Sequence, residues 1–89
     1  MYAISIKLDG CKLSSDTIKK YIEEIDSFLW DYGIYRSYGL LIAPDYLNAV
    51  DCVIATQKLN NTFEWFSDNI SEINLLRIDE ISDLMRAIQ

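Results

Sequence analysis

The sequence contains no histidine, and this absence excludes several kinds of active site. Histidine is the most frequent general base, it activates serine and cysteine nucleophiles, and together with cysteine it forms many zinc sites. Hydrolytic chemistry in this chain would therefore have to use carboxylates. Such chemistry is best assisted by a hard divalent cation such as magnesium, held on oxygen ligands, so we expect a metal only if the protein is an active hydrolase.

Cysteine, long apolar runs and positive charge are also scarce. Cys11 and Cys52 follow no spacing pattern, so we expect reduced thiols in a cytoplasmic protein, although pairing of the two stays open. No run of about 18 apolar residues is present, and the start MYAISIKLDG does not resemble a signal peptide, so we expect no membrane association. A formal net charge of −6 disfavours nonspecific binding to a phosphate backbone, although it does not exclude a local basic patch.

Hydrophobic residues, by contrast, are abundant for a chain of this size. Its 89 residues predict one domain spanning residues 1–89, and 51% of them are hydrophobic. A domain this small buries only about 60–65% of the surface that its unfolded chain exposes. Because one small core can hardly accommodate so many apolar side chains, we expect a homodimer formed through an open sheet face and the strands near it.

Two hydrophobic patterns define the N-terminal part of the chain. Residues 2–8 alternate between apolar side chains and small or polar ones, which predicts a strand with one buried face and one open face that includes Lys7. Apolar residues then recur at helical spacing and predict a helix over residues 16–32. We expect Ser15 to cap this helix and Gly33 to end it.

The middle of the chain predicts β-structure followed by a second helix. Residues 34–43 are β-rich around Gly39 and predict either a tight hairpin or one strand bent at a bulge. The second helix is predicted over residues 46–59, ended by Asn60 and Asn61. It carries few charges, which indicates that it is covered more than an ordinary surface helix.

The C-terminal part completes a recognisable order of elements. Thr62 is expected to cap a short turn that carries Trp65 and Phe66, both interpreted as core residues. A strand over residues 70–78 and a short C-terminal helix follow; the apolar residues of that helix are Ile81, Leu84, Met85 and Ile88. The order β-α-β-β-α-β predicts an α+β ferredoxin-like fold, with one antiparallel sheet and both main helices on one face.

In these segments and their order, the sequence resembles the virulence-associated protein D (VapD) family. The opening MYAISIKL corresponds to the family's Met-Tyr-Ala start, and Gly33 corresponds to the glycine that ends its first helix. The further corresponding steps are Gly39-Leu40, Lys58-Leu59, Trp65-Phe66 and the closing ISEINLLRIDEISDL. The resemblance covers nearly the whole length, with short gaps near residues 14 and 45.

The resemblance implies a homodimeric toxin endoribonuclease that cleaves RNA in a toxin–antitoxin setting, with RNA and a cognate antitoxin as partners. It also implies the ferredoxin-like fold of a small CRISPR-associated nuclease that dimerises through its sheet. The family's catalytic aspartate aligns with Lys7, and the serine of its Gly-Ser step aligns with Leu40. A cation and an apolar side chain replace an acid and a hydroxyl, so the resemblance indicates a degraded catalytic site.

Asp9 is the remaining candidate for a catalytic acid. It shares strand parity with Lys7, and a metal site formed with its symmetry mate is conceivable, whereas an Asp before Gly is more often a turn residue. Lys7, Arg36 and Arg77 form either a basic patch for phosphate or ordinary solvated and paired charges. Trp30 falls outside the apolar stripe of its helix, which places it under a loop or in a protein–protein contact.

Three functions follow from these observations. The first is a VapD-like homodimer with a degraded catalytic site that acts by binding a protein or nucleic acid. The second is an active metal-dependent endoribonuclease toxin that uses Asp9. The third is a ferredoxin-like structural or regulatory module without a toxin connection. Metal-dependent RNA cleavage separates the second from the other two.

Overall fold

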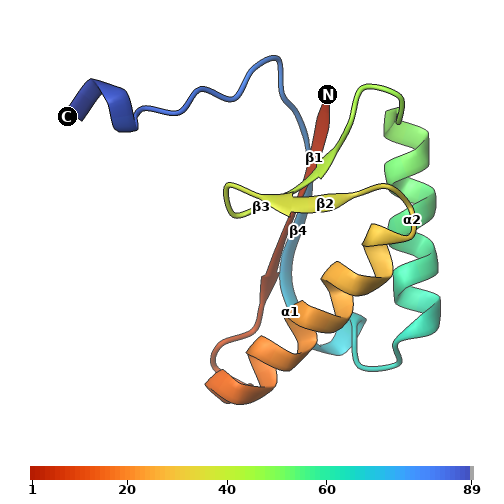
Figure 1. The fold of residues 1–89 in the computed structure, drawn as a ribbon. Coiled ribbons are helices and arrows are strands. Elements are labelled where there is room, and N and C mark those ends of the chain that lie inside the picture. Colours follow the sequence, from red (N-terminus) through yellow and green to blue (C-terminus); the bar gives the residue numbers. More distant parts are fainter. Residues whose placement is uncertain (89) are drawn as a thin grey trace.

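The first strand lies in the middle of the sheet. In the computed structural model, which describes residues 1–88, four strands pair in the order β2-β3-β1-β4, and every pairing is antiparallel. The elements are β1 (Tyr2–Leu8), α1 (Ser15–Trp30), β2 (Tyr35–Ser37), β3 (Leu40–Ala43), α2 (Ala49–Thr62) and β4 (Ile70–Arg77). This arrangement confirms the predicted ferredoxin-like α+β fold (Figure 1). Gln89, the last residue of the predicted domain, lies outside the described residues.

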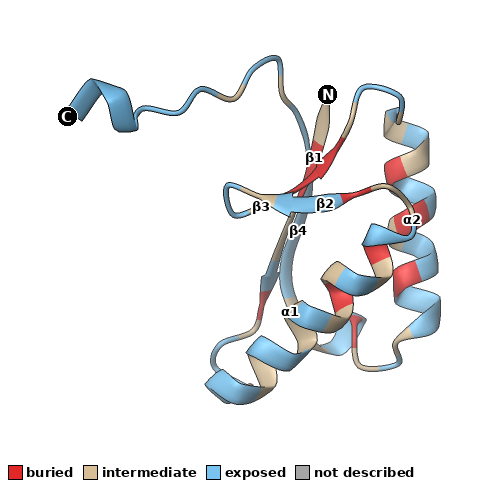
Figure 2. Cartoon of the chain, viewed as in Figure 1, coloured by how far each residue is buried: buried red, intermediate tan, exposed pale blue. Residues whose placement is uncertain are grey.

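Both helices cover the same face of the sheet. Ile4 and Leu8 of β1 and Leu41 of β3 belong to one buried cluster that also contains Leu29 of α1 and Leu59 of α2. The alternation along β1 separates a helix face from an opposite face, as predicted. The opposite face is exposed at Lys7, whereas Ala3 and its partner Ile42 on that face are buried, so it is less open than predicted. Figure 2 shows buried residues recurring along α1 and α2, whereas β4 and the C-terminal segment are mostly exposed.

Helix α1 begins one residue earlier than predicted. Ser14, not Ser15, is its N-cap, because the backbone N–H of Thr17 donates to the Ser14 hydroxyl oxygen at 3.2 Å. The helix ends at Trp30, and Gly33 adopts a left-handed φ of 81° in the loop that follows. This conformation is the one expected of a glycine that turns the chain out of a helix.

Residues 34–43 form a tight hairpin, which resolves the two alternatives. β2 pairs with β3 so that Tyr35 lies opposite Ile42. The two residues at the turn, Tyr38 and Gly39, have φ values of 55° and 76°. Two consecutive left-handed residues are typical of the type I′ turn that suits the twist of paired strands.

Helix α2 lies three residues further along the chain than predicted. The backbone N–H of Asp51 donates to the Asn48 side chain at 2.9 Å, and the Asn48 N–H donates to the Asp51 carboxylate at 2.9 Å. This capping box fixes the start of the helix. Thr62 does not cap the next turn, because it is the last helical residue and its hydroxyl donates to the Lys58 carbonyl at 2.8 Å.

The outer side of α2 and the C-terminal segment are less covered than predicted. Val50, Val53 and Ile54 of α2 are exposed. Among the described residues after β4, only Met85–Ile88 form a helical turn, of 3-10 type, so the predicted C-terminal helix is shorter than expected. Figure 1 shows residues 79–88, which we call the C-terminal segment, in blue, leading away from the sheet. The exposed large apolar side chains of this segment are Leu84, Met85 and Ile88.

No helix in the described part of the chain has both the length and the apolarity required to cross a membrane.

Candidate functional site

Lys7 and Leu40, the two positions that the resemblance aligns with the family's catalytic aspartate and serine, lie on the open face of the sheet. Lys7 of β1 alternates away from the buried Leu8 and pairs with Glu72 of β4. Leu40 of β3 lies two residues from Ile42, which pairs with Ala3 of β1. Since residues two apart share a face, Leu40 and Lys7 are on the same side of the sheet.

The surroundings of Lys7 are polar and carry both signs of charge. Glu72 stands directly across from it, and the Asn74 side-chain amide donates to the Glu72 carboxylate at 3.3 Å. Ser5 pairs with Asn74 in the same register. An exposed ammonium group beside one carboxylate fits an anionic group such as a phosphate, but it does not fit a divalent cation, whose protein ligands are mainly carboxylates.

Asp9 lies one residue beyond β1, in the turn that leads to α1. Its carboxylate accepts a hydrogen bond from the Cys11 backbone N–H at 3.0 Å, and its own N–H donates to the Asn69 carbonyl at 2.9 Å. These contacts give Asp9 a role in holding the turn. Within residues 1–88, no three histidine, cysteine or acidic side chains are grouped to hold a metal ion, so catalysis by Asp9 stays a prediction.

Lys7, Arg36 and Arg77 do not gather into one basic patch. Arg36 pairs with Leu41 and Arg77 pairs with Tyr2, so both arginines have the parity of the helix face, whereas Lys7 lies on the open face. The guanidinium of Arg36 also contacts the Asp26 carboxylate at 2.7 Å. Of the two alternatives that the sequence left open, ordinary paired charge holds for Arg36, and strand parity separates both arginines from Lys7.

Cys52 is unsuited to act as a nucleophile. It is buried in α2 on the helix face, and burial raises the pKa of its thiol above the ordinary value of 9.0, with the nearby charge of Asp51 adding to the effect. A thiol that stays protonated at neutral pH is a weak nucleophile and a poor metal ligand. Cys11 is exposed in the turn after β1, and both cysteines are free, so they do not pair with each other.

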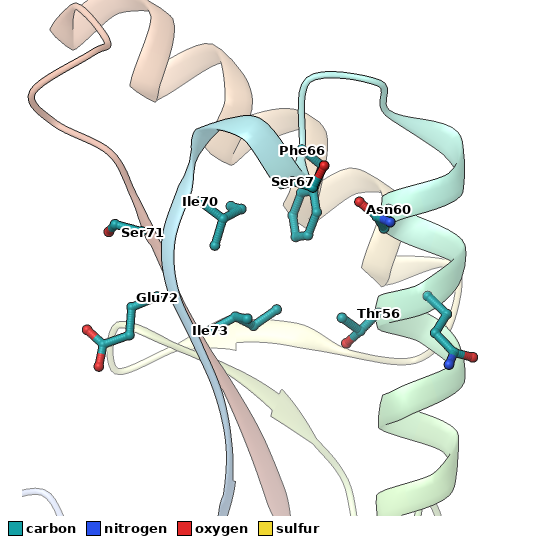
Figure 3. Close-up of a pocket in the computed structure, with 9 residues that line it drawn as sticks. Thr56, Asn60, Phe66, Ser67, Ile70, Ser71, Glu72 and Ile73 are labelled. Atoms are coloured by element: carbon teal, nitrogen blue, oxygen red, sulfur yellow. The ribbon is translucent and has the colours of Figure 1, made fainter.

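An apolar groove, which we call the β4 groove, runs between α2 and the edge strand β4. Its wider part has a volume of about 450 Å³ and its narrower part about 190 Å³, and the two share Thr56, Gln57 and Ile73. Figure 3 shows Phe66, Ile70 and Ile73 projecting into the space between β4 and α2. The groove exists because α2 packs over β1 and leaves β4 largely uncovered, so apolar side chains of β4 are exposed on this face.

Trp65 and Phe66 are core residues, as predicted. Phe66 is buried, and the Trp65 ring stacks on that of Tyr21, with centroids 3.7 Å apart and an interplanar angle of 3°. A ring already stacked within the protein leaves little face for a nucleobase.

Trp30, in contrast, is 69% exposed at the end of α1 and is not covered by a loop. It lines a second small hollow, which we call the aromatic pocket. The pocket has a volume of about 210 Å³ and is formed by Trp30, Gly33, Tyr35, Pro44 and Tyr46.

Comparison with known proteins identifies the family. A Riemerella anatipestifer protein named "Endoribonuclease VapD 2" is 30% identical to this chain over an alignment of 93 positions, gaps included. The alignment covers 99% of this chain and 99% of that protein. This chain belongs to the VapD family. A Helicobacter pylori protein named "Endoribonuclease VapD homolog" is 29% identical over 92 residues, covering 100% of the chain and 97% of the relative. No family model matches the sequence. The VapD resemblance of the sequence is thus confirmed.

Reasoning from the sequence missed the β4 groove and the aromatic pocket. The apolar residues of α2 and β4 fit a fully covered core, and only the position of α2 over β1 shows that some of them are exposed. The aromatic pocket had a weaker signal, because Tyr35 follows Gly33 at the start of β2 and Tyr46 follows Pro44 in the loop before α2. Their proximity depends on the hairpin that brings these segments to one end of the sheet.

Proposed function

We propose that this VapD-family protein has little or no endoribonuclease activity and acts by binding, as a homodimer. The observation that carries the proposal is Lys7 on the open face, at the position that the resemblance aligns with the family's catalytic aspartate. An ammonium group repels a divalent cation and cannot accept a proton, so it can neither hold a metal nor act as a general base. Leu40, on the same face, offers no hydroxyl.

The open face remains suited to binding. Lys7 supplies an exposed positive charge, and Ser5 and Asn74 supply neutral hydrogen-bonding groups beside it. Such a set contacts phosphate groups or acidic side chains without cleaving them. RNA and a cognate antitoxin are therefore the proposed partners, in a cytoplasmic toxin–antitoxin setting suggested by the family.

Exposed apolar surface beside β4 supports the homodimer. β4 is an edge strand of eight residues, so one row of its backbone groups has no strand partner within residues 1–88. Ile73 and Leu75 of β4 and Val53 of α2 are exposed beside it, and so are the apolar residues of the C-terminal segment. The sequence predicted an interface on the open sheet face, and that prediction is untested. The exposed apolar residues beside β4 lead us to propose instead that the C-terminal segment of one copy pairs with β4 of the other and covers the β4 groove.

The activity is tested by incubating the purified protein with RNA, with and without magnesium. We expect no cleavage above that of a buffer control. We also expect the protein to bind the intact RNA or to co-purify with a partner protein. Robust metal-dependent cleavage that is lost in Asp9→Asn would contradict the proposal and place the active site at Asp9. Circular dichroism of the Asp9→Asn protein controls for loss of the turn that this carboxylate holds.

A further inference from the structure

The aromatic pocket is built by the end of α1, the start of the hairpin and the loop between β3 and α2. Trp30 ends α1, Gly33 and Tyr35 lie at the start of the hairpin, and Pro44 and Tyr46 lie between β3 and α2. The Tyr46 hydroxyl lies so close to Gly33 that a Cβ there would be 2.6 Å away. The ring of Tyr46 therefore rests against a glycine backbone, with no side chain of the loop between them.

Three aromatic rings in this pocket have surfaces that this chain does not cover. Trp30 and Tyr46 are 69% and 74% exposed, and Tyr35 is also exposed. A single exposed apolar side chain is ordinary, but several aromatic rings gathered around one hollow are typical of a recognition site. At about 210 Å³ the pocket is smaller than the roughly 300–1,000 Å³ of pockets for drug-sized ligands, so it suits one side chain.

The charges near the pocket favour a cationic occupant. Asp31 follows Trp30 and Asp45 precedes Tyr46, and both carboxylates are exposed. The amino group of Met1 lies 3.2 Å from the Asp45 carboxylate, an exposed contact that offsets only part of this charge. Helix α1 ends at Trp30 with no basic residue in its last turn, so its partial negative charge also faces this region.

We propose that the aromatic pocket binds an arginine side chain presented by a partner protein. A planar guanidinium stacks on the faces of tryptophan and tyrosine and pairs with nearby carboxylates. RNA fits less well, because Asp31 and Asp45 repel its phosphates. The proposal names the chemistry of a partner for the binding role inferred above, and its test uses no RNA cleavage, so either proposal can fail without the other.

The test is an NMR titration of the ¹⁵N-labelled protein with a blocked peptide of sequence Gly-Ser-Arg-Gly-Ser-Arg-Gly-Ser. The indole N–H signals of Trp30 and Trp65 are distinguished by a Trp30→Phe sample. We expect the peptide to shift the Trp30 signal and leave that of the stacked Trp65 in place. Replacing both peptide arginines with glutamate should abolish the shift.

Variants of the protein separate pocket binding from general electrostatic attraction. Tyr46→Ala should weaken peptide binding by about three- to fivefold, the effect of losing one exposed cation–π contact. Asp31→Asn with Asp45→Asn should weaken it as well, whereas Tyr38→Asn, which removes an exposed aromatic ring in the hairpin turn, should leave it unchanged. The proposal is overturned if the arginine peptide leaves Trp30 unperturbed, if the glutamate peptide binds equally, or if a short single-stranded RNA binds the pocket more tightly.

Discussion

Among single residues, Arg36 and Asp26 form the best-defined polar link between the hairpin and α1. Two hydrogen bonds of 2.7 and 2.8 Å join the guanidinium to the carboxylate, and both side chains are about one third exposed. We expect Asp26→Asn to lower the free energy of unfolding by about 1 kcal/mol, because a bidentate, partly shielded ion pair stabilises the folded state more than an exposed ion pair does. Urea unfolding measures the change. Asp45→Asn, at the highly exposed pair with Met1, is the matched control and should change stability by less than about 0.5 kcal/mol.

Cys52 should make stability depend on pH in the alkaline range. Burial and the charge of Asp51 raise the pKa of its thiol above 9.0 in the folded protein, so above about pH 9 the unfolded chain loses this proton first. The free energy of unfolding is therefore expected to fall as the pH rises through this range. Cys52→Ala lacks this contribution and should show a shallower fall between about pH 8 and pH 10, despite a lower overall stability. Equal slopes for the two proteins would contradict the assignment.

Among the structural elements, the hairpin turn has an unusual residue at its first position. Tyr38 has a φ of 55°, a conformation that Asn tolerates better than Tyr, and Gly39 has a φ of 76°. We expect Tyr38→Asn to raise the thermal midpoint and Gly39→Ala to lower the free energy of unfolding by about 1 kcal/mol. Nothing lies within 4 Å of a Cβ placed at Gly39, so the cost is one of backbone conformation and not of crowding. An unchanged free energy of unfolding in Gly39→Ala would contradict the left-handed conformation of Gly39.

The sequence predicted those elements whose pattern depends on local chemistry. The alternation along β1 and the apolar stripe of α1 located both elements to within two residues, and family resemblance and element order together indicated the fold. The start of α2 was misplaced because its capping box at Asn48 was overlooked in favour of Pro44 and Asp45. The length of the C-terminal helix was overestimated because its apolar side chains, although spaced as in a helix, are largely exposed and do not pack on the rest of the described structure.

The site was less predictable than the fold, because it depends on which face each strand residue occupies. Alternation placed Lys7 on the open face correctly, but the grouping of Lys7 with Arg36 and Arg77 ignored that the two arginines have the opposite parity. Trp30 was recognised as an outlier of α1. Its pocket partners Tyr35 and Tyr46 were not, since only the folded hairpin brings them together.

For the whole molecule, the proposed homodimer depends on the C-terminal segment. If residues 79–88 of one copy cover the β4 groove of the other, a chain ending at Ile78 should be monomeric at micromolar concentration, whereas the full chain should be dimeric. Ile73→Asp, which places a charge in the groove, should have the same effect. Light scattering coupled to size exclusion measures both. A dimer that survives truncation and Ile73→Asp would place the interface on the open face instead.

The central claim is that the side chain at position 7 determines whether this protein cleaves RNA. Its most direct test compares Lys7→Asp with Leu40→Ser against Lys7→Ala with Leu40→Ser in one magnesium-containing RNA assay, alongside the native chain. Both double variants remove the ammonium group and restore the hydroxyl, and only the first supplies a carboxylate. We predict cleavage by the aspartate variant about 10²–10⁴ times faster than by the alanine variant, the usual effect of a positioned acid or base. Native protein that cleaves RNA as fast as the aspartate variant would contradict the account.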